Sequence, residues 1–305
     1  MPTPQFHTPI LFLIFNRPDT TAKVFERIRE IKPKKLFVSA DGPRTNKPGE
    51  AERCEETRRI IDGVDWECEV HRNFSSENLG CKRGVVKGIT WFFENAEEGI
   101  IIEDDCILEE SFFAFAEEML ARYRNDERIM HIGAANFQDG KIRGDASYYF
   151  SKLCHVWGWA TWRRAWKHYD VQIKTFEKFK TENGISKILK DEKMQAHWMK
   201  LFRTVYDNAL DTWDFQWVYS VWEQGGMSVI PNVNFVSNIG FGEDATHTLD
   251  SAHVLAENKT GKLEEIVHPE KMQADEEADL YTFYRKIYQS KWSKVKTKVK
   301  SIFKK

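Results

Sequence analysis

The first 110 residues alternate between short apolar runs and segments suited to helices. Residues 9–15, 36–40 and 99–102 are mostly apolar runs, each followed at once by polar or turn-forming residues. Such runs are typical of strands buried in a parallel sheet, and residues 66–71 make one further expected strand. Helices are expected between these strands, at about residues 19–31 with Asp19 as N-cap, 47–62 and 81–92.

This β-α-β-α-β-α-β order predicts an α/β fold, with a Rossmann-like, mostly parallel central sheet flanked by helices on both faces. In such sheets, ligands bind beyond the carboxyl ends of the strands. The loops that begin near Asn16, Asp41 and Asp104 are therefore the first places to look for a site.

After residue 110 the pattern loosens into a more helical half. The tryptophans at 159, 162 and 166 have helical spacing, which predicts packing. The other expected elements are a helix at 112–123, a strand at 129–133, helical runs at 176–190 and 193–210, a strand at 227–230 and a glycine-rich loop at 238–242. We expect one domain over 1–250, made of two halves of about 1–110 and 111–250, then a C-terminal extension over 251–305.

Composition excludes several classes. The 305 residues have a formal net charge of −2, so no basic field favours nucleic acid. The five cysteines have no C-x-x-C spacing, which disfavours a disulfide framework and a zinc cage and indicates a reducing compartment. No apolar stretch of about 18 residues or signal peptide is found, so we expect a cytoplasmic protein.

The apolar run at 99–102 leads directly into Glu103, Asp104 and Asp105. Carboxylates at the end of a buried parallel strand would hold a magnesium- or manganese-type cation that bridges two phosphates. Such a cation acts as a Lewis acid on a departing diphosphate. A solvated acidic turn before the helix at 112 is the other interpretation, and the triplet alone does not separate the two.

Several short motifs, in this order and spacing, resemble glycosyltransferases of the GT-A fold. The similarity covers roughly residues 8–245 and is nearest to N-acetylglucosaminyltransferase I, to its protein O-mannose-linked relative, and to bacterial haemolysin-accessory-like sugar transferases. The motifs are Asn16-Arg17-Pro18, Asp41-Gly42, Asn78-Leu79-Gly80 and the run from Ile100 to Asp105.

The resemblance implies that Asn16 and Arg17 line a nucleotide pocket and that Asp41 accepts a hydrogen bond from uracil or ribose. An arginine pairs well with phosphate oxygens, although Asp41 also suits a plain tight turn. Lys82 and Arg83, at an expected helix start, suit a phosphate- or sugar-facing role, and an ordinary helix start explains them equally well.

Within the acidic triplet, the resemblance assigns Asp105 to the metal, Mn²⁺ or Mg²⁺. It assigns Asp104 to the ribose or sugar of the donor, with Glu103 in support. The residues themselves do not rank the three.

The family places the catalytic base in a late Trp-Asp pair, which Trp213 and Asp214 match. Asp214 would take the proton of the acceptor hydroxyl. Asp211 is the rival, and capping of the following helix is the alternative for both. Trp157 lies in a segment that resembles one bordering the donor sugar in this family.

The loop at 238–242 has the composition of a lid over bound donor, and Ser237 or His247 would reach the diphosphate or the metal. Residues 291–305 carry seven lysines among apolar residues at helical spacing. Two interpretations stay open for this basic amphipathic tail: an interfacial helix in peripheral contact with the inner face of an anionic membrane, or a solvated end.

The sequence therefore predicts a metal-dependent transferase that moves a sugar from a UDP-type donor to a glycan or lipid-linked acceptor with inversion, in surface polysaccharide or lipopolysaccharide assembly. One alternative is a sugar-phosphate nucleotidyltransferase, although residues 16–19 lack the glycine-rich loop usual there. A second is a carbohydrate-binding relative without turnover.

Overall fold

The computed structural model describes residues 6–240 and 259–288. The strands are β1 (Ile10–Ile14), β2 (Lys35–Ala40), β3 (Glu69–Phe74), β4 (Glu98–Glu103), β5 (Cys106–Leu108), β6 (Ile129–Gly133), β7 (Tyr148–Ser151), β8 (Trp159–Trp162), β9 (Met227–Pro231) and β10 (Val236–Asn238). The helices are α1 (Pro18–Ile31), α2 (Glu50–Arg59), α3 (Gly80–Asn95), α4 (Glu110–Tyr123), α5 (Arg163–Trp166), α6 (Phe176–Thr181), α7 (Glu192–Tyr206), α8 (Asp214–Glu223) and α10 (Glu276–Thr282), with single turns η1 (Ile60–Gly63), η2 (Gly184–Lys187) and η3 (Phe283–Ile287).

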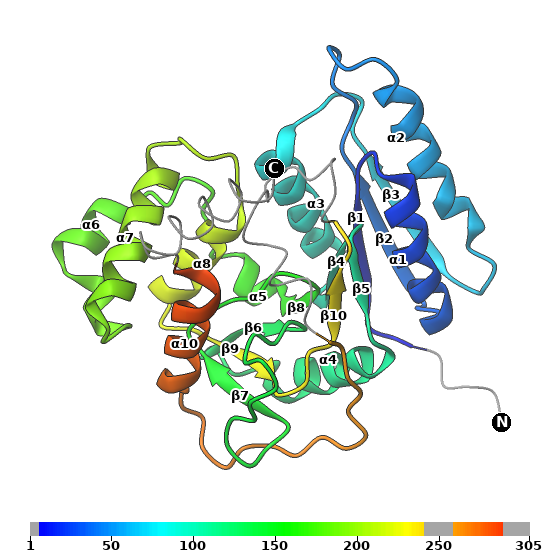
Figure 1. Cartoon of the computed structure of the whole chain (residues 1–305). Coiled ribbons are helices and arrows are strands. Elements are labelled where there is room, and N and C mark those ends of the chain that lie inside the picture. The colour runs from blue at the N-terminus through cyan, green and yellow to red at the C-terminus, as the bar shows by residue number, and fades with distance from the viewer. Residues whose placement is uncertain (1–5, 241–258, 289–305) are drawn as a thin grey trace, which may run out of the picture.

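Eight strands form one mixed sheet in the order β3-β2-β1-β4-β8-β6-β9-β7. The part made by β3, β2, β1 and β4 is parallel throughout, and β8 runs antiparallel between β4 and β6. Strands β5 and β10 pair in a separate two-stranded antiparallel sheet. The predicted α/β architecture, Rossmann-like with a mostly parallel sheet, is confirmed (Figure 1).

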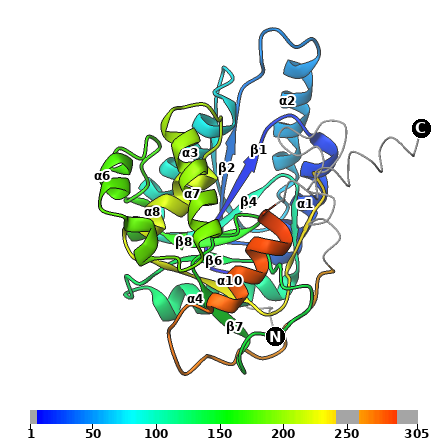
Figure 2. The same cartoon turned by 60° about the vertical axis from the view of Figure 1, so that its left-hand side comes forward.

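The alternation of side chains along β1 explains why the sheet is covered on both faces. Ile10, Phe12 and Ile14 belong to a hydrophobic cluster with residues of α1 and α4. Leu11 and Leu13 point the other way, into a cluster with residues of α3, α7 and α8. Figures 1 and 2 show α1 and α2 on one side of the parallel strands and α3 on the other. Continuous apolar runs were therefore a correct sign of strands buried on both faces.

Two predicted boundaries are wrong. Strand β3 spans Glu69–Phe74, about three residues later than expected, because the residues that suggested it, such as Trp66, pack against the α1 side from a turn. Helix α1 begins at Pro18 with Arg17 before it, and Asp19 lies in its first turn. Proline is favoured at the first helical position because it has no N–H to leave unpaired.

The tryptophans at 159, 162 and 166 are buried, as the prediction of packing required. Their helical spacing was misleading, because Trp159 and Trp162 lie on strand β8 and only Trp166 is helical. Burial of both faces of β8 removes the alternation that would have marked a strand.

The C-terminal extension is partly integral to the domain. Ala274 forms a bridge with Phe150 next to β7, and Phe283 is fully buried. The side-chain Nε2 of Gln138 donates to the carbonyl of Ala278 at 3.0 Å and to the hydroxyl of Thr282 at 2.7 Å. The expected boundary at 250 and the tail at 291–305 lie outside the described residues. Within the described residues, no helix is long and apolar enough to cross a membrane.

Two neutral histidines are built into the core. The Nδ1 of His131 accepts from the indole N–H of Trp217 at 3.2 Å, which leaves its Nε2–H to donate to the carbonyl of His155 at 3.1 Å. Burial lowers the pKa of His131 to about 3 and that of His155 to about 4. Protonation in this core would cost both the desolvation of a charge and, at His131, the bond from Trp217.

These histidines predict a loss of stability in acid. The pKa of His155 is lower in the folded chain than the ordinary 6.5, so its contribution to the free energy of unfolding is complete above pH 6.5. This contribution is lost as the pH falls toward 4. We expect the parent to lose about 2 kcal/mol relative to a His155→Phe variant between pH 7 and pH 5. Urea unfolding at both pH values measures this, with His7→Phe at an exposed position as control. Parallel curves for parent and His155→Phe would contradict the prediction.

Candidate functional site

The carboxyl ends of β1, β2 and β4 meet at one edge of the sheet. In the registers of the three strands, Leu13 lies opposite Glu103 and Ile14 lies opposite Ala40. The loops that follow therefore start side by side, as predicted for a ligand crevice in a parallel sheet.

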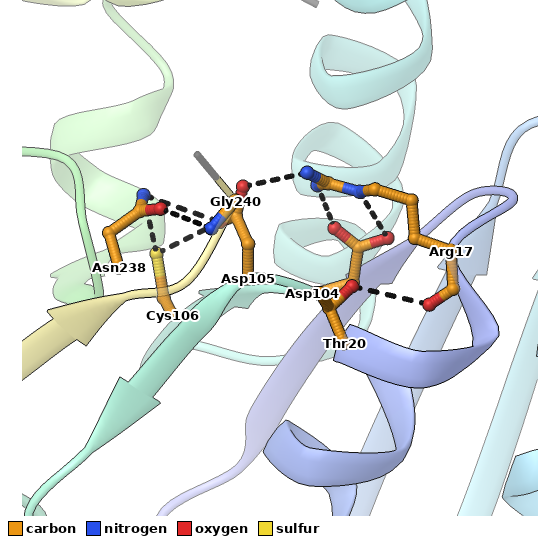
Figure 3. Close-up of polar contacts among 7 residues, drawn as sticks. All are labelled: Arg17, Thr20, Asp104, Asp105, Cys106, Asn238 and Gly240. Atoms are coloured by element: carbon orange, nitrogen blue, oxygen red, sulfur yellow. Dashed lines mark hydrogen bonds and ion pairs between the residues drawn. The ribbon is translucent and has the colours of Figure 1, made fainter. Parts of the chain in front are cut away.

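Arg17 brings the first loop onto the acidic triplet (Figure 3). Its Nη2 is paired with Oδ1 of Asp104, its Nε lies 3.4 Å from Oδ2 of the same carboxylate, and its Nη1 lies 3.0 Å from Oδ2 of Asp105. The hydroxyl of Thr20 donates to the carbonyl of Arg17 at 3.2 Å, which holds the turn into α1. One guanidinium thus bridges two adjacent carboxylates.

The triplet places three carboxyl groups beside one guanidinium, and this crowding shifts their pKa values. Burial and the charges of Asp105 and Asp104 raise the pKa of Glu103 to about 8, although Arg17 opposes this shift. Burial likewise raises the pKa of Asp104 to about 6 against the influence of Arg17. The charge of Asp214 adds to the shift at Glu103. Crowded, desolvated carboxylates of this kind favour the binding of a cation.

The residues fit a cation that is shared with a ligand. Across residues 6–240 and 259–288, no group of three or more His, Cys, Asp or Glu side chains is arranged to hold a metal by itself. Within the triplet, the side chain of Asp105 is 13% exposed and that of Asp104 only 4%. Asp105 thus presents hard oxygen ligands at the rim, and a bound diphosphate would complete the coordination of Mn²⁺ or Mg²⁺.

Asp41 holds the start of α3. Its carboxylate accepts hydrogen bonds from the backbone N–H of Gly42 at 2.9 Å, of Leu79 at 2.9 Å and of Gly80 at 3.1 Å, and from the side chain of Asn78 at 2.9 Å. Burial raises its pKa in spite of these bonds. The Asp-Gly and Asn-Leu-Gly motifs are therefore one structural unit, and the contact of Asp41 with a nucleoside stays a prediction.

Three other predicted residues are placed around this unit. The side-chain amide of Asn16 donates to Glu50 at 2.9 Å, at the start of α2. The ammonium of Lys82 bonds the side chain of Asn208 at 2.5 Å, and Arg83 is exposed. Lys82 thus ties α3 to the segment before α8, whereas none of these contacts tests a role in binding phosphate.

Asp214 is the first residue of α8, and the hydroxyl of Thr212 donates to it. The thiol of Cys81 shows that carboxylates from distant segments converge here. The pKa of Cys81 is raised to about 12, mainly by burial and next by the charges of Glu103, Asp211 and Asp214. Asp211 is partly engaged, since it accepts from the backbone N–H of Lys82 at 3.3 Å. No sequence motif around Cys81 had indicated that it would lie near these carboxylates.

A stack of aromatic rings supports the start of α8. The rings of Trp213 and Trp159 are stacked with centroids 5.7 Å apart and planes 22° apart. The hydroxyl of Tyr169 donates to the carbonyl of Trp213 at 3.1 Å. Because Trp159 lies opposite Ile101 on β4, this stack connects the position of Asp214 to the strand that carries the triplet.

The segment around Trp157 is built for packing. Trp157 is half-buried with its ring edge-on to Phe137, the centroids being 5.6 Å apart. The next residue, Gly158, has a φ of 63°, and a Cβ there would lie 2.5 Å from the side chain of Leu108. The glycine is required by this turn and by Leu108, and contact of Trp157 with a sugar stays a prediction.

Strand β10 brings residues 238–240, the described part of the predicted glycine-rich loop, to the triplet. Ser237 lies opposite Ile107, and the next residues reach Asp105. His247 lies outside the described residues. Asn238 and Gly240, which contact Asp105 directly, were not recognised individually in the sequence.

The fold and these side chains define an α/β protein with a cluster of acidic side chains at the carboxyl ends of its parallel strands. No protein-family model matches the chain, and no curated protein sequence matches it. The crystal structure of HddC from Yersinia pseudotuberculosis is similar over 52% of this chain and 77% of that one, with 8% identity and a TM-score of 0.30. The structure of a UDP-glucose pyrophosphorylase complexed with UDP-glucose is similar over 47% and 61%, with 12% identity and a TM-score of 0.25. Similarities this slight carry no argument about the reaction.

Proposed function

We propose that this chain is a metal-dependent glycosyltransferase that transfers a sugar, with inversion, from a UDP-type nucleotide sugar to a glycan or lipid-linked acceptor. One observation carries the proposal. Three adjacent carboxyl groups lie at the end of β4, an arginine from the loop after β1 pairs with two of them, and the charge of a carboxylate at the start of α8 reaches the third.

On the donor side, a nucleotide diphosphate needs a carboxylate that holds a metal ion and a cationic side chain that contacts phosphate. The triplet and Arg17 would supply these two groups. Asp105 would hold Mn²⁺ or Mg²⁺, and the cation would stabilise the negative charge of the departing diphosphate. Arg17 pairs with Asp105 and Asp104, and we propose that its guanidinium also contacts phosphate oxygens of the bound donor. Asn16, Asp41, Asp104, Ser237 and Trp157 are proposed to line the donor, and His247 to join the metal.

On the acceptor side, Asp214 is the proposed base. Its charge raises the pKa of both Glu103 and Cys81, which supports a position close to these two groups. An inverting transfer needs one carboxylate there to accept the proton of the attacking hydroxyl. We propose surface polysaccharide or lipopolysaccharide assembly as the setting.

The competing nucleotidyltransferase reaction would need a phosphate-binding loop after the first strand. Here only three residues, Phe15 to Arg17, separate β1 from α1, and none is glycine. The geometry therefore favours sugar transfer.

Product analysis separates these reactions. The purified chain is incubated with a panel of UDP-sugars, with and without Mn²⁺, and the released phosphates are identified by chromatography. We expect Mn²⁺-dependent release of UDP. A second incubation supplies UTP and a sugar 1-phosphate, and release of pyrophosphate there would favour a nucleotidyltransferase. Binding of UDP-sugar without turnover in either incubation would favour a non-catalytic relative.

A further inference from the structure

The end of β10 and the residues that follow it also contact Asp105. The antiparallel pairing of β5 and β10 places Asn238 opposite Cys106, and the backbone N–H of Ile239 then donates to the carbonyl of Asp105 at 2.8 Å. A segment more than 130 positions away in the sequence is thereby joined to the proposed metal ligand.

The orientation of the Asn238 amide is determined by a local bond. Its Oδ1 accepts from the backbone N–H of Gly240 at 2.8 Å, so its Nδ2 faces Oδ1 of Asp105 at 3.5 Å and Sγ of Cys106 at 3.8 Å. The side chain is 9% exposed, so water does not readily replace these contacts. Asn238 thus directs a donor at one oxygen of the Asp105 carboxylate.

Gly240 borders the other oxygen. A Cβ at this position would lie 2.2 Å from Oδ2 of Asp105 and 3.0 Å from Nη1 of Arg17. Gly240 is not among the residues with positive φ, so the position requires a glycine for space and not for backbone conformation. Figure 3 shows both residues against Asp105, with Arg17 reaching the carboxylate from α1.

We infer that Asn238 and Gly240 are positioning residues that set the orientation of the Asp105 carboxylate for the cation and the diphosphate. The inference rests on the proposed function, because it takes Asp105 as the metal ligand. Replacement of a group that orients a metal ligand commonly weakens metal binding by about 10- to 100-fold.

The test measures Mn²⁺ affinity directly, by the decrease in the electron paramagnetic resonance signal of free Mn²⁺ in the presence of saturating UDP. We expect Asn238→Ala and Gly240→Ala each to weaken Mn²⁺ binding by about 10-fold or more. The matched control is Asn234→Ala, two residues before β10, whose side chain bonds the carbonyl of Val236 at 2.9 Å and the N–H of Asn136 at 3.1 Å. We expect its Mn²⁺ affinity to stay within about twofold of the parent.

Thermal unfolding of each metal-free variant separates positioning from general loosening. Weaker Mn²⁺ binding in Asn238→Ala and Gly240→Ala, but not in an equally destabilised Asn234→Ala, supports the inference. Parent-like affinity in the two variants, or equal losses in all three that follow their loss of stability, overturns it while leaving the proposed function intact. A parent chain that binds neither Mn²⁺ nor UDP overturns both.

Discussion

Replacement of Asp105 with alanine is expected to abolish the uptake of Mn²⁺ together with UDP. Asp105 is the rim carboxylate of the triplet, and its removal leaves Asp104 buried under Arg17. Because substitutions that only orient a metal ligand cost about 10- to 100-fold, loss of the ligand itself should cost more than about 100-fold in Mn²⁺ affinity. Titration calorimetry with UDP in Mn²⁺ measures the effect.

The same variant should remain folded. Asp105 pairs with Arg17 but also repels Glu103, so the two contributions to the metal-free stability oppose each other. In the parent, Mn²⁺ and UDP together should raise the melting temperature, since both bind only the folded chain, and this rise should be absent in Asp105→Ala. Asp126→Ala, at a surface ion pair with Arg128, is the control. An Asp105→Ala protein that takes up UDP and Mn²⁺ like the parent would refute the proposed site.

Replacement of Asp214 with asparagine is expected to lower the turnover number for sugar transfer by about 10²- to 10⁴-fold, the usual contribution of a general base. Asparagine has the same shape and keeps an oxygen to accept from Thr212, so the start of α8 should not move. The affinity for UDP in Mn²⁺ should therefore stay within about twofold of the parent. Release of UDP from the parent's best donor and acceptor gives the rate, and calorimetry gives the affinity.

Asp211→Asn is the matched comparison, because Asp211 also lies near Cys81 but is engaged with the backbone of Lys82. We expect it to retain most of the turnover. If Asp211→Asn loses turnover and Asp214→Asn keeps it, the base is Asp211. If both variants keep it, neither carboxylate is the base.

The parallel part of the fold could be predicted from the sequence because a strand buried on both faces is a continuous run of apolar residues. Strands β1, β2 and β4 are runs of this kind and can be recognised without knowing their partners. The boundaries failed where a tertiary contact outweighed the local pattern. Trp66 packs as part of a turn, and Trp159 and Trp162 line a strand although their spacing is helical.

The candidate site was foreseen only as far as chemistry and strand ends allow. Polar residues after buried strands must meet at one edge of a parallel sheet, so Arg17 and the triplet could be associated in advance. Which carboxylate is buried, and which is open at the rim, depends on where the arginine lies, and its place depends on α1 starting at Pro18. The sequence could not rank Asp104 and Asp105 for that reason.

The sequence by itself determined the order of the elements, the acidic strand end and the types of group available for chemistry, because these depend on residues close together in the chain. Only the tertiary structure decided that Asp41 caps α3, that the charge of Asp214 reaches Glu103, and that Asn238 and Gly240 close around Asp105. The contact between Asn238 and Asp105 joins residues 133 positions apart. Their geometry follows from how the sheet, α8 and β10 pack together, and no local pattern records it.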